Sequence, residues 1–282
     1  MTFHRSVLTV LTTASIAALA LSACQKGEKA KTPAPSSSEA KITKADFPDW
    51  PGGKMPEVPK GTVEPGAVDA LKNMSRYLMS LKTIGLQSEG TLDAVTAEGQ
   101  RVQLDGQTSY KLRRPGMAIH FVSDMKNRDF YYDGKQFTIY SPALKYYATA
   151  PAPPTNREAL DVMYNKYGLK LPLEDLFRWN DTGNERIDQL KAAADLGPSM
   201  QNGVQTTHYA FREPEVDWEV WIKDGDQPLP MKMAIVDRTD PARPAFTARL
   251  KWTVNPSLSD ADFTFKPSKD DKRIQLAQFQ GK

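Results

Sequence analysis

The stretch FTARLKWTV, residues 246–254, has the most regular alternation of side chains in the chain. Its odd-numbered residues are polar or charged, and its even-numbered residues are apolar: Phe246, Ala248, Leu250, Trp252 and Val254. A period of two is that of a strand with one face buried and the other face in water. The stretch therefore predicts an antiparallel sheet that covers a core with one of its faces.

The same period recurs on both sides of this strand. Asp133-Gly134, between two aromatic runs, is a strong signal for a two-residue hairpin turn. Further strands are predicted over residues 86–92, 102–104, 108–112, 117–122, 130–132, 137–140, 145–149, 208–211, 218–222, 231–235 and 263–265.

Helical periodicity is confined to the start and the middle of the domain. A helix is predicted from Pro65, with an apolar face of Val68, Leu71, Met74, Leu78 and Leu81. In the middle, one helix is predicted from Asn156, a second short helix from Pro172 and a third over residues 185–194.

This order of elements has no βαβ rhythm, which argues against a parallel sheet. The predicted fold class is α+β, with a single curved antiparallel sheet and an N-terminal helix. The middle helices would lie over the concave face as a lid, with Leu160, Met163, Leu173, Leu176 and Phe177 as its apolar residues.

The N-terminus has the layout of a secretory signal. His4 and Arg5 precede an uncharged apolar segment over residues 7–21, which is shorter than the roughly 20 residues that span a bilayer. The run Leu21-Ser22-Ala23-Cys24 places the only cysteine where a bacterial lipoprotein is cleaved and lipidated. We expect a signal peptide over residues 1–23 and lipidation at Cys24; ordinary secretion is the alternative. By analogy with enterobacterial sorting, Gln25 in place of an aspartate favours the outer membrane.

Composition divides the remaining chain. Residues 24–66, rich in Lys, Pro, Ser and Ala, predict a disordered tether, followed by a domain over 67–270 and a polar tail over 271–282. The formal net charge of the whole chain is +3, with charges of both signs interspersed. A net charge this small, without a cluster of basic residues, is not typical of a protein that binds nucleic acid, and we exclude nucleic acid as a partner.

Catalytic chemistry is not indicated. Only His120 and His208 follow the predicted cleavage site, and no cluster has the spacing of metal ligands. Asp124 and Asp129 lie near His120 in sequence, but on strands and turns such residues usually form a solvated face. We predict no enzyme, no metal and no cofactor.

Several segments resemble the LolA/LolB lipoprotein-carrier superfamily, and more closely an uncharacterised family of predicted periplasmic proteins within it. The residues that carry the resemblance are Arg114-Pro115-Gly116, residues 133–142 (DGKQFTIYSP), 146–153 (YYATAPAP), 167–176 (YGLKLPLEDL) and 218–222 (WEVWI).

The resemblance implies a half-open β-barrel with a helical lid over an apolar cavity that takes acyl chains. It also implies that Arg114 latches the lid by hydrogen bonding to the lid helices. The hairpin turn Asp133-Gly134-Lys135 departs from the outer-membrane receptor, which carries a protruding apolar residue there. This departure argues against a role as lipoprotein receptor.

A curved sheet under a lid has more concave surface than its own helices readily fill, and methionine suits an adaptable binding surface. The alternative is a filled core. The candidate ligand-binding residues are Met117, Ile119, Phe121, Trp218, Val220, Met231, Met233, Phe246, Leu250 and Trp252.

We therefore expect a monomeric, lipid-anchored periplasmic protein that binds a hydrophobic ligand, the acyl chain of a lipid or lipoprotein, in envelope trafficking. The alternative is a sensor or scaffold that contacts envelope proteins without catalysis.

Overall fold

A computed structural model describes residues 61–169, 171, 173, 176 and 185–278, all within the compact unit Pro56–Lys282. The predicted signal peptide, Cys24, most of the predicted tether and Phe177 lie outside the described residues.

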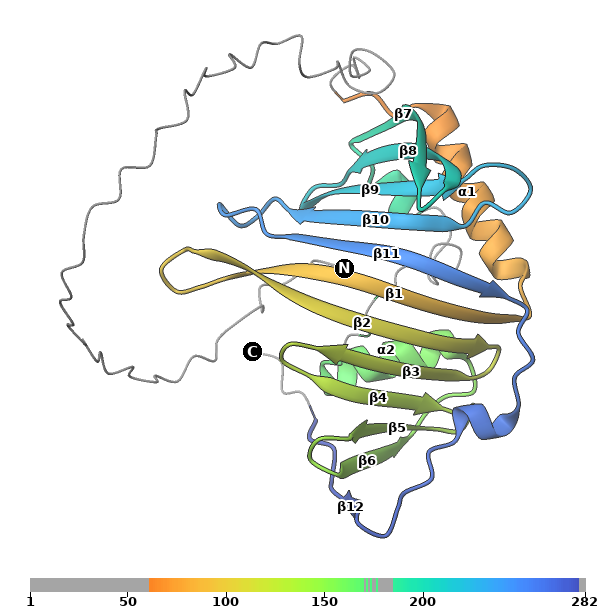
Figure 1. Cartoon of the computed structure of the whole chain (residues 1–282), viewed down its shortest axis with the longest axis vertical. Helices are drawn as coiled ribbons and strands as arrows, with labels where there is room; N and C mark the ends of the chain where they lie inside the picture. The colour runs from red at the N-terminus through yellow and green to blue at the C-terminus, as the bar shows by residue number, and fades with distance from the viewer. Residues whose placement is uncertain (1–60, 170, 172, 174–175, 177–184, 279–282) are drawn as a thin grey trace, which may run out of the picture. The chain divides into compact units, whose positions relative to one another are not determined.

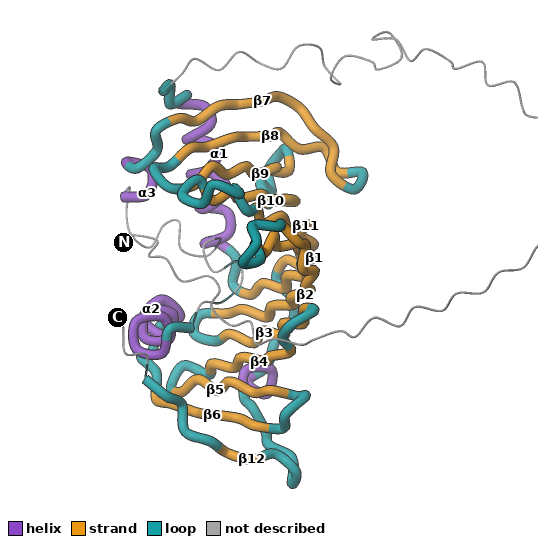
Figure 2. The backbone as a smooth tube through the Cα atoms, turned by 90° about the vertical axis from the view of Figure 1, so that its left-hand side faces the viewer, coloured by secondary structure: helices purple, strands orange, loops and turns teal. Residues whose placement is uncertain are grey.

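The described residues form one large sheet with the two long helices on one of its faces (Figures 1 and 2). The helices are α1 (Pro65–Ser80), α2 (Asn156–Tyr167), the short α3 (Glu185–Asp188) and the 3-10 helix η3 (Asp260–Phe263). The strands are β1 (Thr83–Val95), β2 (Arg101–Arg113), β3 (Met117–Ser123), β4 (Asn127–Tyr132), β5 (Gln136–Ser141), β6 (Tyr146–Pro151), β7 (Ala192–Gln201), β8 (Val204–Arg212), β9 (Val216–Lys223), β10 (Pro230–Asp237), β11 (Ala245–Val254) and β12 (Lys272–Arg273).

The strand order is β12-β6-β5-β4-β3-β2-β1-β11-β10-β9-β8-β7, and every neighbouring pair is antiparallel except β12 with β6. Two meanders, β1–β6 and β7–β11, are joined where β1 pairs with β11. The sheet is not closed. The predicted α+β class, antiparallel sheet and N-terminal helix are confirmed.

Register decides which side chains face the helices. Leu86 on β1 pairs with Trp252 on one side and Tyr110 on the other, so all three share a face. In β11 the alternation predicted from the sequence is present: Ala248 and Leu250 are buried, while Arg249 and Lys251 are exposed. Figure 2 shows α1 and α2 on the same side of the sheet, which bends around them.

Both long helices begin and end where the sequence supplies the right residues. Pro65 is the first residue of α1, whose apolar face is buried as predicted. The Thr155 hydroxyl accepts a hydrogen bond from the Glu158 N–H at the start of α2. Gly168 ends α2 in the left-handed region, with φ +67°, and its N–H donates to the Tyr164 carbonyl.

The helix predicted over residues 185–194 is wrong in its second half, because α3 ends at Asp188 and β7 begins at Ala192. Ala193 is fully buried, pairs with Phe211 of β8 and forms a bridge with Val63 just before α1. Its small side chain permits this close contact beside α1, and tertiary packing outweighs the helix propensity of alanine.

The strand predicted over residues 263–265 is also wrong. Ser259 and Asp262 form a reciprocal capping box that begins a 3-10 turn, and Phe263 is the last residue of that turn. The helix predicted from Pro172 falls largely outside the described residues; Leu173 and Leu176, which are described, are buried.

The C-terminal segment runs from the end of β11 past η3 to β12, beyond β6 (Figure 1). On the face opposite to the buried Tyr132, the Phe265 ring packs against the rings of Tyr131, Tyr140 and Tyr147, with centroid distances of 4.8–5.6 Å. Residues predicted as a polar tail thus include β12, which pairs in parallel with β6.

Candidate functional site

A cavity of about 360 Å³ lies where the ends of β1, β2 and β3 meet the last turn of α1 and the first turns of α2. Its apolar lining includes Leu81, Ile84, Leu112, Met117, Ile119 and Leu160. Its polar lining consists of Lys82, Arg113, Arg114, Thr155, Asn156 and Arg157. A chamber of this size falls at the lower end of the range for small-molecule sites.

Strand register builds the floor of the cavity. Ile84 pairs with Leu112, and Leu112 pairs with Met117, so one row of apolar side chains crosses three strands. Tyr110 and Ile119 form the next row. Each of these side chains is at least nine-tenths buried, which makes the floor apolar and shielded from bulk water.

Asn156 fastens the first turn of α2 to the β2–β3 turn. Its Nδ2 donates to the Arg113 carbonyl at 2.8 Å, and its Oδ1 accepts from the Gly116 N–H at 2.9 Å. Gly116 is buried, so this N–H depends on a protein partner. The side-chain amide therefore holds α2 in place over the floor of the cavity.

A second contact holds the segment before α2. The Tyr132 hydroxyl donates to the Pro153 carbonyl at 2.5 Å. Burial, together with the nearby carboxylates of Asp133 and Glu158, raises the pKa of Tyr132 to about 12. The hydroxyl therefore remains a donor over the whole physiological pH range.

Arg114 contacts the end of α1. Its Nη1 donates to the Leu81 carbonyl at 2.9 Å, and α1 has no basic residue in its own last turn. A guanidinium at this position satisfies a carbonyl at the C-terminal end of the helix and complements the helix dipole. The described hydrogen bonds of Arg114 go to the end of α1. That Arg114 also hydrogen-bonds to the lid helices between residues 156 and 194 stays a prediction.

The structure brings four of the predicted site residues to the cavity: Met117, Ile119, Leu160 and Arg114. The other predicted ligand-binding residues lie outside its lining: Phe121, Trp218, Val220, Met231, Met233, Phe246, Leu250 and Trp252. Val220, Met233 and Leu250 are buried in the main core, and the Trp218 ring stacks on Phe211 with centroids 4.2 Å apart. Met163 and Leu173 belong to the same core.

Sequence reasoning missed most of the lining residues, among them Ile84, Leu112 and Asn156. Ile84 and Leu112 are apolar positions of strands, and alternation could have found them. Nothing in the sequence marks Asn156, because its partners come from a turn forty residues earlier.

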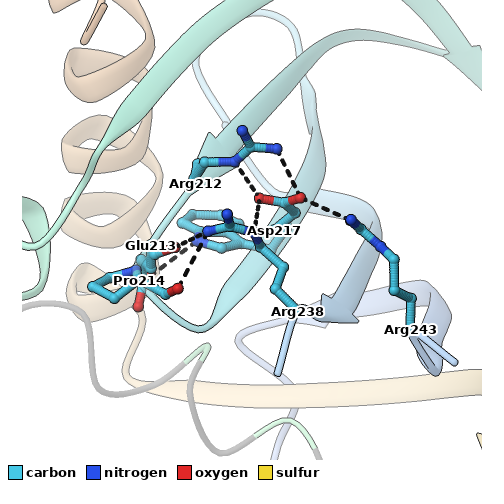
Figure 3. Close-up of polar contacts among 7 residues, drawn as sticks. Arg212, Glu213, Pro214, Asp217, Arg238 and Arg243 are labelled. Carbon is cyan, nitrogen blue, oxygen red and sulfur yellow. Dashed lines mark hydrogen bonds and ion pairs between the residues drawn. The ribbon is translucent and has the colours of Figure 1, made fainter. Parts of the chain in front are cut away.

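Three arginines surround Asp217, at the ends of the strands that lie away from the cavity (Figure 3). Arg212 makes two hydrogen bonds to its carboxylate, at 2.6 and 2.9 Å, and Arg243 makes a third at 3.1 Å. Burial alone would raise the pKa of Asp217, but the hydrogen bonds and charges of Arg212 and its neighbours outweigh it, and the pKa is lowered. This group fastens the β8–β9 turn to the β10–β11 turn.

Both histidines of the domain have carboxylate partners. His120 Nδ1 lies 2.5 Å from Asp129 Oδ1, and His208 Nε2 lies 2.8 Å from Glu219 Oε2. Asp124, by contrast, accepts a hydrogen bond from the Asp105 N–H. Within the part of the chain that the structure describes, no group of three His, Cys, Asp or Glu residues could hold a metal ion. Among the same residues, no helix is long and apolar enough to cross a membrane.

The fold and the site define an α+β protein with an open antiparallel sheet and an apolar cavity beneath a helix. Residues 67–277 match the family described as predicted periplasmic protein (DUF2092), and the chain belongs to this family. This match confirms the resemblance to a family of predicted periplasmic proteins that the sequence indicated. No curated protein matches this chain.

Solved structures that are similar to this chain include the following three. An uncharacterized conserved protein from Thermus thermophilus has 10% identity and a TM-score of 0.42, over 74% of this chain and 99% of its own. The lipoprotein LppX from Mycobacterium tuberculosis has 9% identity and a TM-score of 0.42, over 70% and 98%. A putative outer membrane lipoprotein-sorting protein domain from Vibrio parahaemolyticus has 12% identity and a TM-score of 0.32, over 70% and 97%. Such values are too low to assign a ligand or a partner.

Proposed function

We propose that this protein is a non-catalytic periplasmic binding protein that holds an acyl chain in the cavity beneath α2. In this proposal Cys24 carries a lipid that anchors the protein to the outer membrane. The acyl chain in the cavity is the ligand that the protein binds in envelope trafficking. The observation that supports the proposal is the cavity itself, whose floor is a continuous row of buried apolar side chains on β1, β2 and β3.

The cavity suits a flexible aliphatic chain better than a polar metabolite. Its buried surface offers Ile, Leu and Met side chains and the ring of Tyr110, and its charged groups lie in the turns and the first turn of α2. Each methylene removed from water contributes about 0.8 kcal/mol, so a chain segment of about eight methylenes gains roughly 6 kcal/mol before the costs of binding. That gain exceeds the lower end of the cost of association, about 4 kcal/mol.

The test is native mass spectrometry of the purified full-length protein with lauroyl lysophosphatidylcholine. Ile119→Trp places a larger side chain in the cavity and is expected to abolish the lipid adduct. Phe121→Trp is the matched control, since Phe121 lies two residues further along β3, outside the lining, and is expected to leave the adduct unchanged.

Circular dichroism confirms that each variant is folded. An adduct of equal intensity in the wild type and in folded Ile119→Trp would contradict the proposal. So would the absence of any adduct in the wild type, which would favour a sensor or scaffold that binds envelope proteins instead.

A further inference from the structure

A second cavity, the α1 groove, lies between α1 and the loop that joins β9 to β10 (Figure 1). Its volume is about 540 Å³, within the range of small-molecule sites, and its described lining shares no residue with the cavity beneath α2. The apolar part of the lining consists of Ala70, Tyr77, Tyr209, Ile222 and Pro228. The α1 groove is therefore a separate place where a ligand could bind.

One wall of the α1 groove is a polar stripe along α1. Asn73, Tyr77 and Ser80 follow the helical spacing, so they share one face of the helix. The exposed Arg76 adds a guanidinium, whose Nη1 donates to Asn73 Oδ1 at 2.9 Å. No carboxylate among the described residues forms an ion pair with Arg76. Most of its five N–H donors are thus left for water or for a ligand.

The other wall is the β9–β10 loop, whose two aspartates differ in what they contact. Asp224 Oδ1 accepts a hydrogen bond from Thr207 Oγ1 at 2.8 Å, and the Asp224 N–H donates to the Gln205 carbonyl at 3.1 Å. These bonds fasten the start of the loop to β8. The exposed side chain of Asp226 forms no hydrogen bond or ion pair with a described residue. This wall therefore presents one unpaired carboxylate.

The unpaired groups of the two walls carry opposite charges but do not meet. Within the described structure no ion pair joins Arg76 to Asp226. Lys223, the other cation of the lining, donates to Gln227 Oε1 at 3.3 Å. Around Asp217, by contrast, opposite charges are in direct contact. The α1 groove is thus complementary to a ligand with an anionic group and a cationic group at separate positions.

We propose that the α1 groove binds a short peptide as a zwitterion, with its carboxylate at Arg76 and its ammonium group at Asp226. A guanidinium binds a carboxylate through two parallel hydrogen bonds, and an ammonium group donates charge-assisted bonds to a carboxylate. The chain between the two ends lies over Tyr209 and Ile222. An extended tripeptide is roughly 10 Å long, which suits a groove of this volume. This inference is independent of the acyl-chain proposal.

The experiment is calorimetric titration of the full-length protein with trialanine, N-acetyl-trialanine and trialanine amide. The three peptides share a chain, but the second lacks the ammonium group and the third lacks the carboxylate. Because each end contacts a partly solvated charge, blocking either end is expected to weaken binding to the wild type about threefold. This comparison needs no variant, so it does not depend on the folding of one.

Two variants assign the ends of the peptide to the walls. Arg76→Gln is expected to weaken binding of trialanine about threefold and to leave trialanine amide unaffected, because that peptide has no carboxylate to lose. Asp226→Asn is expected to weaken binding of trialanine and to leave N-acetyl-trialanine unaffected. The control Asp69→Asn/Lys72→Gln removes one charge of each sign from exposed positions of α1 outside the lining, and it should bind like the wild type.

The inference is overturned if trialanine does not bind to the wild type, or if both blocked peptides bind as tightly as trialanine does. It is also overturned if folded Arg76→Gln loses affinity equally for trialanine and its amide, or if the control loses as much affinity as Arg76→Gln. None of these results bears on the acyl chain, because the described linings of the two cavities are separate.

Discussion

Replacing Asn156 with alanine is expected to lower the free energy of unfolding by about 2–4 kcal/mol. The Gly116 N–H loses its acceptor at 2.9 Å and, because Gly116 is buried, is left without water as a substitute. A buried donor without a partner costs about 1–3 kcal/mol, and the lost bond from Asn156 Nδ2 to the Arg113 carbonyl adds about 1 kcal/mol. The Gly116 carbonyl also loses a long hydrogen bond from Asn156 Nδ2, at 3.4 Å. We add no cost for that bond, because the carbonyl keeps its hydrogen bond from the Arg113 N–H.

Urea titration of the full-length protein measures this loss, provided that the slope of the unfolding free energy against urea is the same in both proteins. Asn165→Ala is the matched control, because Asn165 lies on the same helix and is exposed. Its effect should stay within about 0.5 kcal/mol. If Asn156→Ala loses less than about 0.5 kcal/mol, or no more than Asn165→Ala, the fastening of α2 by this amide is refuted.

Two further predictions concern the lipid anchor at Cys24 and the ion pair of Asp262 in η3 with Lys111. Metabolic labelling with a fatty-acid probe should mark the wild type and not Cys24→Ala, and equal labelling of both would contradict lipidation at this residue. The hydrogen bond from Lys111, followed by those from Ser259, lowers the pKa of Asp262 from its ordinary 3.8 to about 2. Its stabilising effect is therefore present above about pH 4 and is lost as the pH falls towards 2. Asp262→Asn should flatten the pH dependence of unfolding in that window, and a wild-type slope there in the variant would exclude Asp262 as its source.

Regular periodicity made much of the fold predictable. The structure has both the alternation in residues 246–254 and the apolar face of the helix from Pro65. Both were predictable because each pattern indicates which face of the element is buried. The strand that begins at Ala192 was missed because three alanines carry no strand signal, and only the bridge with Val63 and the pairing with β8 explain their conformation.

The candidate site was less predictable than the fold. An inward-facing residue such as Met117 follows from alternation, but alternation does not say whether its neighbours leave space or fill it. Met233 has the same pattern and is buried in the same core, but it does not line the cavity. The cavity lining depends on α1, three strands and α2 meeting in space, and Asn156 acts through backbone groups that no sequence pattern identifies.

The pairing of β1 with β11 also has a consequence for how the protein is made. Strands β2 to β10 separate these two partners along the chain, so a ribosome completes the first meander long before the strand that covers the free side of β1 emerges. The segment that brings Phe265 onto Tyr131, Tyr140 and Tyr147 emerges later still. A chain that stops before Ala245 would keep β1 as an uncovered edge, a ready template for pairing with another chain. Premature termination is therefore expected to yield an aggregating fragment rather than a smaller working domain.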